Sequence, residues 1–311
     1  MVRIFRNSLV LGSLLLALTT FAQAQATRTF ISGVGNDADP CSRTAPCRTW
    51  SGAFIKTFIN GEINALDPGG YGGLNITKSI TLDGNGTHAS TLASGITGFT
   101  INIAAGNVND PHRSVRLRNL SINGTGPSGA VGTRTGIDGV RIISAADVHI
   151  DNVLINDFSQ DGVEIAAGAT VELIMNDVII RNCSQSGLQL DTTAGEVVAQ
   201  LDNVRVQNCA TGIDAEDNVR LGIKHSVFTH NTNGIRTIGN NNILNIEDVF
   251  VAYATTGVRA SPGSTIRISN SMITQNSTGI NANGGTMTSL NGNTVFGNTL
   301  DGLFTASQSK L

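Results

Sequence analysis

The chain has 311 residues, of which 14% are charged and 40% are hydrophobic, and it contains 36 glycines. This composition excludes a disordered chain and favours a turn-rich β protein. The formal net charge is −3 and no basic run stands out, so we expect no nucleic-acid partner.

Residues 1–26 have the pattern of a secretory signal peptide. Arg3 and Arg6 supply the positive start, residues 9–18 form an apolar run, and the Ala-Gln-Ala pattern of residues 22–26 provides small-residue cleavage sites. The apolar run is too short for a membrane span, and no later segment is long enough. We therefore predict a secreted or periplasmic protein without a membrane span. Removal of the two arginines leaves 18 basic against 23 acidic residues, a net charge of −5.

Residues 27–60 are predicted to form an N-terminal cap. Cys41 and Cys47 lie six residues apart, and an exported protein meets oxidising conditions, so we expect them to form a disulfide. A zinc site is disfavoured because no further Cys or His lies near with ligand spacing. Apolar residues then recur at helical spacing: Trp50, Ala53, Phe54 and Phe58. A short amphipathic helix here would cover the open end of a repeat domain.

Residues 61–311 are predicted to form one repeat domain. Its first part is less regular, with insertions at residues 106–113 and 124–135. Such loops often carry function, so we treat both as candidate groove walls. Any pocket is expected beneath residues 124–135.

From residue 139 the chain repeats itself. A glycine followed by Val, Leu or Ile recurs 22 to 25 residues apart, at Gly139, Gly162, Gly187, Gly212, Gly234, Gly257, Gly279 and Gly302. A second column runs in step, at Asn152, Asp177, Asn203, Ser226, Asp248 and Ser271. Apolar and polar residues alternate between the columns, which predicts a solenoid of β-coils with three short strands in each coil.

The two columns have different expected roles. The glycines fit positions that need a positive φ or that approach the neighbouring coil closely. The Asn, Asp and Ser column fits tight turns, because Asn and Asp tolerate the left-handed region. Stacked Asn side chains would also form an amide ladder.

The units GVEIAAGATVELIMNDVIIRNC and GVRASPGSTIRISNSMITQNS resemble the coils of right-handed parallel β-helix, or pectin-lyase-like, proteins. The resemblance covers roughly residues 60–311 and points to a secreted member of bacterial type. It implies an all-β solenoid of about ten coils with a short N-terminal capping helix. The group contains polysaccharide lyases, polygalacturonases, pectin methylesterases, alginate epimerases, phage tailspikes and proteins without known activity.

The residue two positions after each glycine is expected to point outward from its strand. These residues belong to the strands that follow the repeating glycines, which together would form the first sheet of the solenoid. Related proteins use this sheet as a polysaccharide groove, so the resemblance makes it the candidate binding face. The candidate substrate-binding residues are Arg141, Gln189, Asp214, Arg236 and Arg259.

Asp138 and Asp161 precede two successive glycines and would stack about 5 Å apart, near Glu164. Two carboxylates so close do not both ionise easily, so one would stay protonated as a general acid, or the two would hold a cation. Asp161, Glu164 and Asp138 are therefore the candidate catalytic residues. The alternative is a solvated ladder of cross-strand ion pairs, with Asp214 beside Arg236 as one example.

Two functions remain open. The first is an exported protein that binds, and cleaves or modifies, a polysaccharide along one parallel sheet, as a lyase or a glycoside hydrolase. The second is a non-catalytic extracellular structural or adhesion module. A tailspike-like trimer is disfavoured by the signal peptide.

No cofactor or metal is expected, and calcium lacks support because the acidic residues 36–39 are too few for a calcium loop. The last coil has no strong cap, so a homo-oligomer through the C-terminal coil is a further hypothesis. Cys183 and Cys209 hold equivalent places in adjacent coils. Their spacing permits either a disulfide or a stack of reduced thiols.

Overall fold

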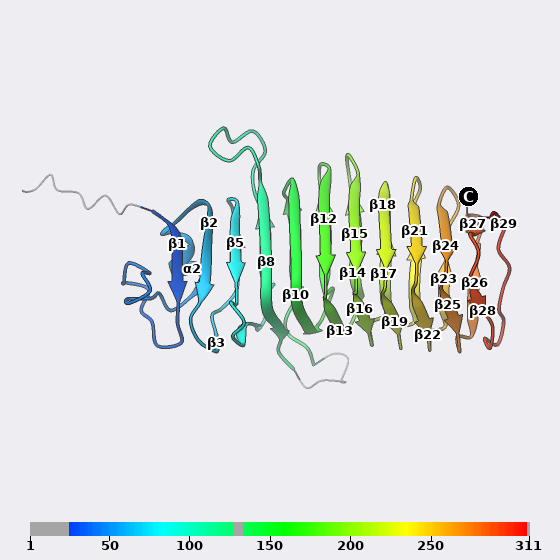
Figure 1. Cartoon of the computed structure of the whole chain (residues 1–311), viewed down its shortest axis with the longest axis horizontal. Coiled ribbons are helices and arrows are strands. Elements are labelled where there is room, and N and C mark those ends of the chain that lie inside the picture. Colours follow the sequence, from blue (N-terminus) through cyan, green and yellow to red (C-terminus); the bar gives the residue numbers. More distant parts are fainter. Residues whose placement is uncertain (1–24, 127–132, 310–311) are drawn as a thin grey trace, which may run out of the picture.

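The computed structural model describes residues 25–126 and 133–309. All but the last two residues of the predicted signal peptide lie outside this range. Within it, one short helix, α2 (Trp50–Phe54), accompanies strands that follow one another along the long axis in chain order (Figure 1). No helix in the described part of the chain is long and apolar enough to cross a membrane.

Within residues 25–126 and 133–309 the strands form two sheets, and every pairing between neighbouring coils is parallel. Sheet B has nine strands: β4 (Leu74–Ile76), β7 (Phe99–Asn102), β9 (Val140–Ser144), β11 (Val163–Ala167), β14 (Ser186–Thr192), β17 (Thr211–Ala215), β20 (Asn233–Thr237), β23 (Thr256–Arg259) and β26 (Thr278–Asn281). Sheet A has twenty strands in two rows that meet at β8 (Ser114–Gly124) and β10 (Asp147–Phe158).

The first row of sheet A continues with β1 (Ala26–Ile31), β2 (Thr57–Ala65), β5 (Ile80–Asp83), β12 (Val171–Asn176), β15 (Val197–Asp202), β18 (Val219–Lys224), β21 (Ile243–Glu247), β24 (Thr265–Ser269), β27 (Thr286–Ser289) and β29 (Ala306–Ser307). The second row continues with β3 (Gly69–Gly70), β6 (Ala89–Ala93), β13 (Ile179–Cys183), β16 (Arg205–Gln207), β19 (Val227–Thr229), β22 (Phe250–Ala252), β25 (Met272–Thr274) and β28 (Thr294–Val295). The rows merge into one sheet because β10 is one continuous strand that pairs with β12 in the first row and with β13 in the second.

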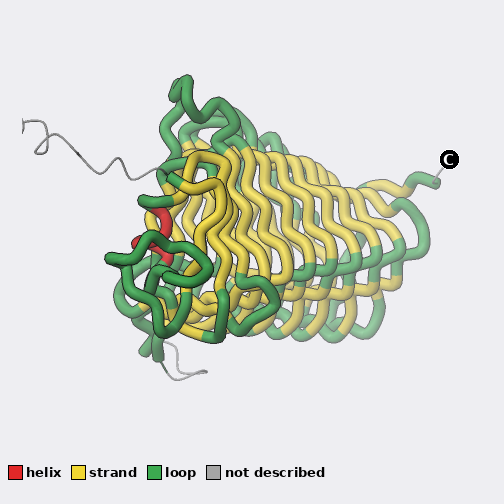
Figure 2. The backbone as a smooth tube through the Cα atoms, turned by 60° about the vertical axis from the view of Figure 1, so that its left-hand side comes forward, coloured by secondary structure: helices red, strands yellow, loops and turns green. Residues whose placement is uncertain are grey.

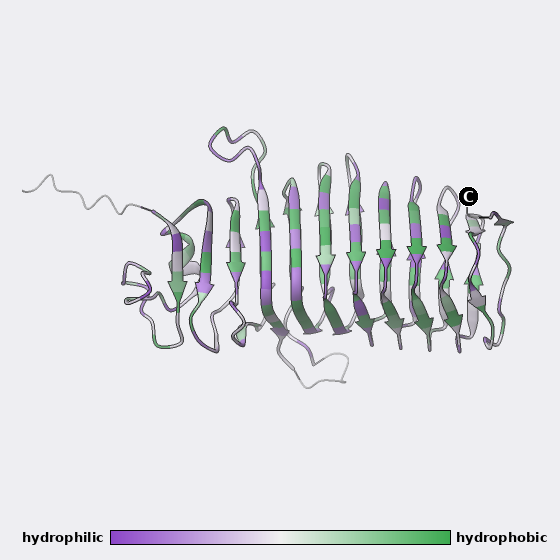
Figure 3. Cartoon of the chain, in the orientation of Figure 1, coloured by the Kyte–Doolittle hydropathy of each residue, from purple (hydrophilic) through white to green (hydrophobic). Residues whose placement is uncertain are grey.

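Each regular coil contributes one strand to each row and one to sheet B. In sheet B, Val163 pairs with Leu188, which pairs with Ile213, and all three side chains are buried. Apolar and polar residues alternate along the strands (Figure 3), as two-residue periodicity requires when one face is buried. The all-β solenoid predicted from the repeat is confirmed, with the apolar stacks forming a core along the axis.

The glycine column serves close approach between coils. A Cβ on Gly162 would lie 2.3 Å from Cγ2 of Ile180 and 2.6 Å from the carbonyl oxygen of Gly187. Of this column only Gly302, with a φ of 80°, has left-handed backbone. The repeating glycine is therefore explained by the close approach of the neighbouring coil, which leaves no space for a side chain, and not by a positive φ.

The turn column is left-handed, as expected for Asn and Asp. Asp177 has a φ of 56°, and its carboxylate accepts a hydrogen bond from the amide of Asn203 at 2.6 Å. The prediction was wrong by one residue at Ser226 and Ser271. The left-handed residues there are His225 and Asn270.

Ser226 points into the core row instead, where its hydroxyl accepts from the Val204 N–H at 3.1 Å and donates to the carbonyl of Lys224 at 2.6 Å. Ser271 repeats this pattern, accepting from the Val249 N–H at 3.1 Å. A serine hydroxyl that both accepts and donates a hydrogen bond with nearby backbone groups can occupy the inward position that valine occupies in other coils.

The N-terminal end is covered by α2 (Figure 2). Trp50 is fully buried and meets the ring of Tyr71 edge-on, with centroids 5.5 Å apart. The expected helix is shorter than its apolar spacing suggested, because Phe58 lies in β2 with 52% of its surface exposed. β2 begins at Thr57 and pairs with β1, so the boundary proposed at residue 60 falls inside a strand of sheet A.

Cys41 and Cys47 form a disulfide in this cap, with their Cα atoms 4.6 Å apart. Cys183 and Cys209 are both free and buried. The two insertions leave opposite ends of the strands, at the top and the bottom of Figure 1. They therefore do not wall a common groove.

Candidate functional site on sheet B

The predicted outward column is one continuous row of neighbours across sheet B. Glu164 pairs with Arg141 on one side and Gln189 on the other. Asp214 follows Gln189, and the row continues through Arg236 to Arg259. Regular parallel pairing thus brings residues that are more than twenty positions apart in sequence onto neighbouring strands.

Most charges in this row are paired within it. Arg141 Nε lies 3.0 Å from Glu164 Oε2 and Arg141 Nη1 lies 3.8 Å from Asp138 Oδ2. Arg236 donates to both carboxylate oxygens of Asp214, at 3.0 and 2.5 Å. The expected pair of Asp214 and Arg236 is therefore present. The row thus contains cross-strand ion pairs, as the alternative interpretation of a charged ladder predicts.

The two aspartates before the glycines lie inside the turn beneath the row. Asp138 Oδ1 accepts a hydrogen bond from the Asp161 N–H at 3.2 Å, and Asp161 Oδ1 accepts one from the Ser186 N–H at 2.6 Å. Each carboxylate thus links its own coil to the next one. Asp138 is fully buried and Asp161 is 2% exposed, so neither touches a molecule on the surface.

Burial dominates the protonation of this group. It raises the pKa of Asp161 to about 7, against the bond from Ser186 and with added repulsion from Asp138 and Glu164. Burial also raises the pKa of Asp138, opposed by its hydrogen bond from Asp161. The pKa of Glu164 is raised by burial and by Asp138, although Arg141 opposes the shift. Close carboxyls with little solvent therefore favour retention of protons.

Among the three candidate catalytic carboxyls, Glu164 alone reaches the surface, with 14% of its side chain exposed. Its Oε2 and the Arg141 Nε are buried and are not aligned for a hydrogen bond, although they form an ion pair. The arrangement has one partly exposed carboxyl above two buried ones. Chemically, it can hold a proton at Glu164 next to a cation.

A groove of about 710 Å³ lies where the insertion at residues 124–135 returns to the solenoid. Arg134 lines it together with the turns that precede β17, β20 and β23. Arg134 is nearly buried and its guanidinium donates to the Ser184 hydroxyl at 3.2 Å. A groove therefore lies beside the described end of this insertion, where a pocket was predicted. Residues 127–132 of the insertion lie outside the described range.

Sequence reasoning missed two features. His230 and Tyr253 occupy successive left-handed turn positions, and their rings stack with centroids 4.7 Å apart beside this groove. Gly222 stands at an outward position in the middle of β18. The signal for Gly222 was available, because a glycine takes the outward place between those of Arg220 and Lys224.

Comparison with known proteins supports the architecture. The structure of XylC in complex with xylose is 8% identical and superposes with a TM-score of 0.62, covering 85% of this chain and 68% of XylC. Pectate lyase Pel9A is 12% identical, with a TM-score of 0.55 and coverage of 86% of this chain and 69% of the lyase. The chain is a right-handed parallel β-helix protein.

The family model described as periplasmic copper-binding protein (NosD) matches residues 171–310 of this β-helix. No curated protein matches the chain. The NosD match covers less than half of the sequence, and at such low identities the solved structures establish the fold alone.

The described residues of the β-helix show no cluster of His, Cys, Asp or Glu suited to a copper ion. Copper in proteins favours thiolate, thioether and imidazole ligands. Among the described residues, no group of three or more His, Cys, Asp or Glu side chains is placed to hold a metal ion. Cys183 and Cys209 do lie together in the matched range, but their mutual hydrogen bond and their burial raise the pKa of the Cys183 thiol. That environment disfavours the thiolate that a metal would need.

Proposed function

We propose that this β-helix protein is exported and binds a polysaccharide along the outward face of sheet B. There Glu164 donates a proton to the glycosidic oxygen as its bond to the anomeric carbon breaks, and water adds to that carbon and returns a proton to the Glu164 carboxylate. The observation that carries the proposal is a partly exposed carboxyl of raised pKa above two buried carboxyls. Perturbed carboxyls next to a specific charge partner are typical of catalytic sites.

Each residue of the row has a role in this proposal. Glu164 faces the sugar, and Arg141 beside it attracts carboxylate or hydroxyl groups of the chain. Asp161 and Asp138 are positioning residues, because they act only through Glu164 and the backbone. Gln189, Arg236 and Arg259 extend the row over further strands and supply hydrogen bonds to more sugar units. Asp214 is buried, and its carboxylate holds the Arg236 guanidinium in place.

A second candidate function is a non-catalytic structural or adhesion module. The ion pairs of Arg141 with Glu164 and of Arg236 with Asp214 favour it, since paired charges need no ligand. The two candidates differ in what a single neutralised carboxyl does. A structural module is unaffected by the neutralised carboxyl, whereas an enzyme that uses the carboxyl as its general acid loses turnover.

The test uses the mature protein and a panel of uronic-acid and neutral polysaccharides, with affinity electrophoresis for binding and assays of unsaturated and reducing ends for cleavage. Glu164→Gln is expected to abolish product formation while binding persists. The matched control is Glu172→Gln, an exposed carboxylate on β12 of sheet A, which should behave as wild type. The proposal fails if the wild type binds no polysaccharide, or if Glu164→Gln leaves turnover unchanged.

Export is part of the proposal and has its own measurement. Gln25 and Ala26 are bound to the solenoid, through Gln25 Nε2 to the Ile55 carbonyl at 3.1 Å and the Ala26 N–H to the Lys56 carbonyl at 2.9 Å. Cleavage after Ala24 preserves both contacts, and cleavage after Ala26 removes them. Mass spectrometry of exported protein should give Gln25 as the first residue.

A further inference from the structure

The outward face of sheet A contains a groove of about 750 Å³ over β15, β18, β21 and β24. It belongs to a different sheet from the Glu164 row and shares no residue with it. Its lining carries three cationic and two carboxylate side chains, at Arg220, Lys224, Arg267, Asp202 and Glu247. The lining side chains alone sum to one positive charge, and Glu196, which lies outside the lining, pairs with Arg220.

A missing side chain deepens the centre of this groove. Gln200, Gly222, Asn245 and Arg267 are successive neighbours across four strands. A Cβ added at Gly222 would meet nothing within 4 Å. Its φ is outside the left-handed region, so the backbone there does not require glycine. Glycine weakens a strand interior, and one without a conformational reason often marks a place where a ligand approaches closely.

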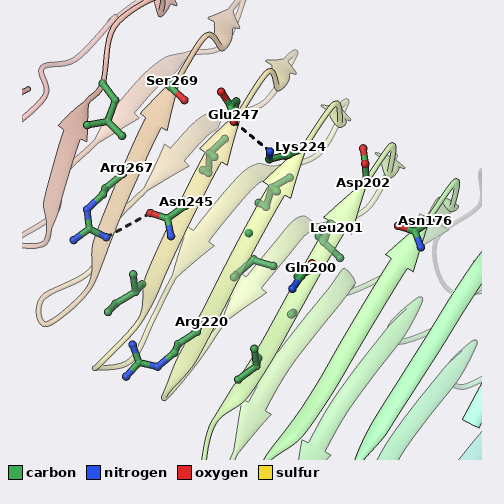
Figure 4. Close-up of a pocket in the computed structure, with 18 residues that line it drawn as sticks. Asn176, Gln200, Leu201, Asp202, Arg220, Lys224, Asn245, Glu247, Arg267 and Ser269 are labelled. Carbon is green, nitrogen blue, oxygen red and sulfur yellow. Dashed lines mark hydrogen bonds and ion pairs between the residues drawn. The ribbon is translucent and has the colours of Figure 1, made fainter. Parts of the chain in front are cut away.

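The side chains around the notch, which is the open space above Gly222, are suited to a sugar. Gln200 and Asn245 flank it with exposed amides, which donate to and accept from hydroxyl groups (Figure 4). At either end of the groove, Arg220 is bound through two hydrogen bonds to Glu196 and Lys224 lies 3.6 Å from Glu247. These two cations are already neutralised by carboxylates.

Arg267 differs from them. Its guanidinium donates to the Asn245 side-chain oxygen at 3.4 Å (Figure 4), and within the described ranges it has no carboxylate partner. A planar guanidinium binds a carboxylate through two parallel hydrogen bonds. The charge that is not balanced by the protein therefore lies one strand from Asn245 and two strands from the notch.

We propose that this Gly222 groove is a second glycan site, which binds a linear polysaccharide whose sugars carry carboxylates. A sugar ring lies over Gly222 between Gln200 and Asn245, and the carboxylate of a neighbouring sugar pairs with Arg267. The chain runs along the solenoid axis, because strands follow one another at about 4.8 Å, close to the length of one sugar unit. The site acts without the Glu164 row.

The experiment is calorimetric titration of the mature protein with oligosaccharides of galacturonate, guluronate and glucuronate, and with their methyl esters. The wild type is expected to bind at least one acidic oligosaccharide and to bind its ester about tenfold more weakly or worse, since a hydrogen-bonded charge pair is lost. Gly222→Leu should abolish binding at this groove by filling the notch, so that one oligosaccharide fewer is bound per chain than in the wild type. Arg267→Gln should remove the preference for the acid over the ester.

Two controls separate this site from folding defects and from sheet B. Gly168→Leu changes an exposed glycine outside the groove, where an added Cβ comes no closer than 3.9 Å to any atom, and it should bind as wild type. Glu164→Gln should also retain the Gly222-dependent binding. The proposal is overturned if the wild type binds none of the acidic oligosaccharides, if Gly222→Leu binds as wild type, or if binding depends on Glu164 alone.

Discussion

Exchange of glycine for alanine at two strand positions tests how the coils are packed. Gly162 belongs to the repeating column, and Gly222 belongs to the outward face of β18. An alanine methyl at position 162 would lie 2.6 Å from the carbonyl oxygen of Gly187, which belongs to the backbone of the next coil. At position 222 the methyl enters open space. Neither glycine has left-handed backbone, so strain in φ does not separate the two.

The expected effects on the free energy of unfolding have opposite signs. Overpacking of a close-packed site costs about 1–3 kcal/mol. Replacement of a glycine in an unstrained position by alanine stabilises by about 0.4–1 kcal/mol, because the unfolded chain loses conformational freedom. Gly162→Ala should therefore be less stable than Gly222→Ala by roughly 1.5–4 kcal/mol.

Urea unfolding followed by far-ultraviolet circular dichroism is the appropriate assay, because it reports on strands throughout the solenoid. Fluorescence of Trp50, the one tryptophan of the chain, would report the N-terminal cap, and repeat proteins can unfold in parts. Equal unfolding midpoints for the two variants would refute the argument from close approach. A Gly222→Ala variant less stable than Gly162→Ala would refute it as well.

Three further predictions follow from the same structure. Asp161 holds its proton longer in the folded state, since its pKa rises from 3.8 to about 7, so its contribution to stability is present below pH 4 and is lost as the pH rises to 7. Asp161→Asn, which keeps an acceptor for the Ser186 N–H, should be more stable than wild type at pH 8 by up to about 4 kcal/mol, and urea unfolding that shows no gain there contradicts the assigned burial. Reduction of the bond between Cys41 and Cys47 should lower the stability of the cap by about 2 kcal/mol, measured as the urea midpoint of tryptophan fluorescence, with an unchanged midpoint as the contrary result. Leu303 is 85% exposed in the last coil; if that coil joins two copies, Leu303→Ser should lower the mass measured by light scattering, and an identical mass argues against this interface.

Much of the architecture was predictable because it follows from local periodicity. A glycine every 22 to 25 residues and alternation within each unit specify coil length and the inward face. The outward row from Arg141 to Arg259 follows from the same register. The error at Ser226 arose because serine is compatible with both a turn and a hydrogen-bonded inward place, so residue type alone did not distinguish them.

The site was predictable only as a set of positions. Stacking of Asp138 on Asp161 could be expected from the repeat, but their burial could not, since it depends on atoms of the next coils. Phe58 illustrates the same limit, because helical spacing does not show where a chain leaves a helix for a strand. The notch at Gly222 also required the structure, which shows that its neighbours leave open space.

The sequence by itself determined that residues about two dozen positions apart become neighbours and which face each residue takes, since both follow from a period along one chain. Only the tertiary structure decided which carboxyls remain in contact with water and which cations remain without a carboxylate partner. Those properties depend on side chains from three or four coils converging at one place, and the energies of burial and pairing are set by that convergence. Glu164 and Arg267 are therefore distinguished from their neighbours in the repeat by their surroundings.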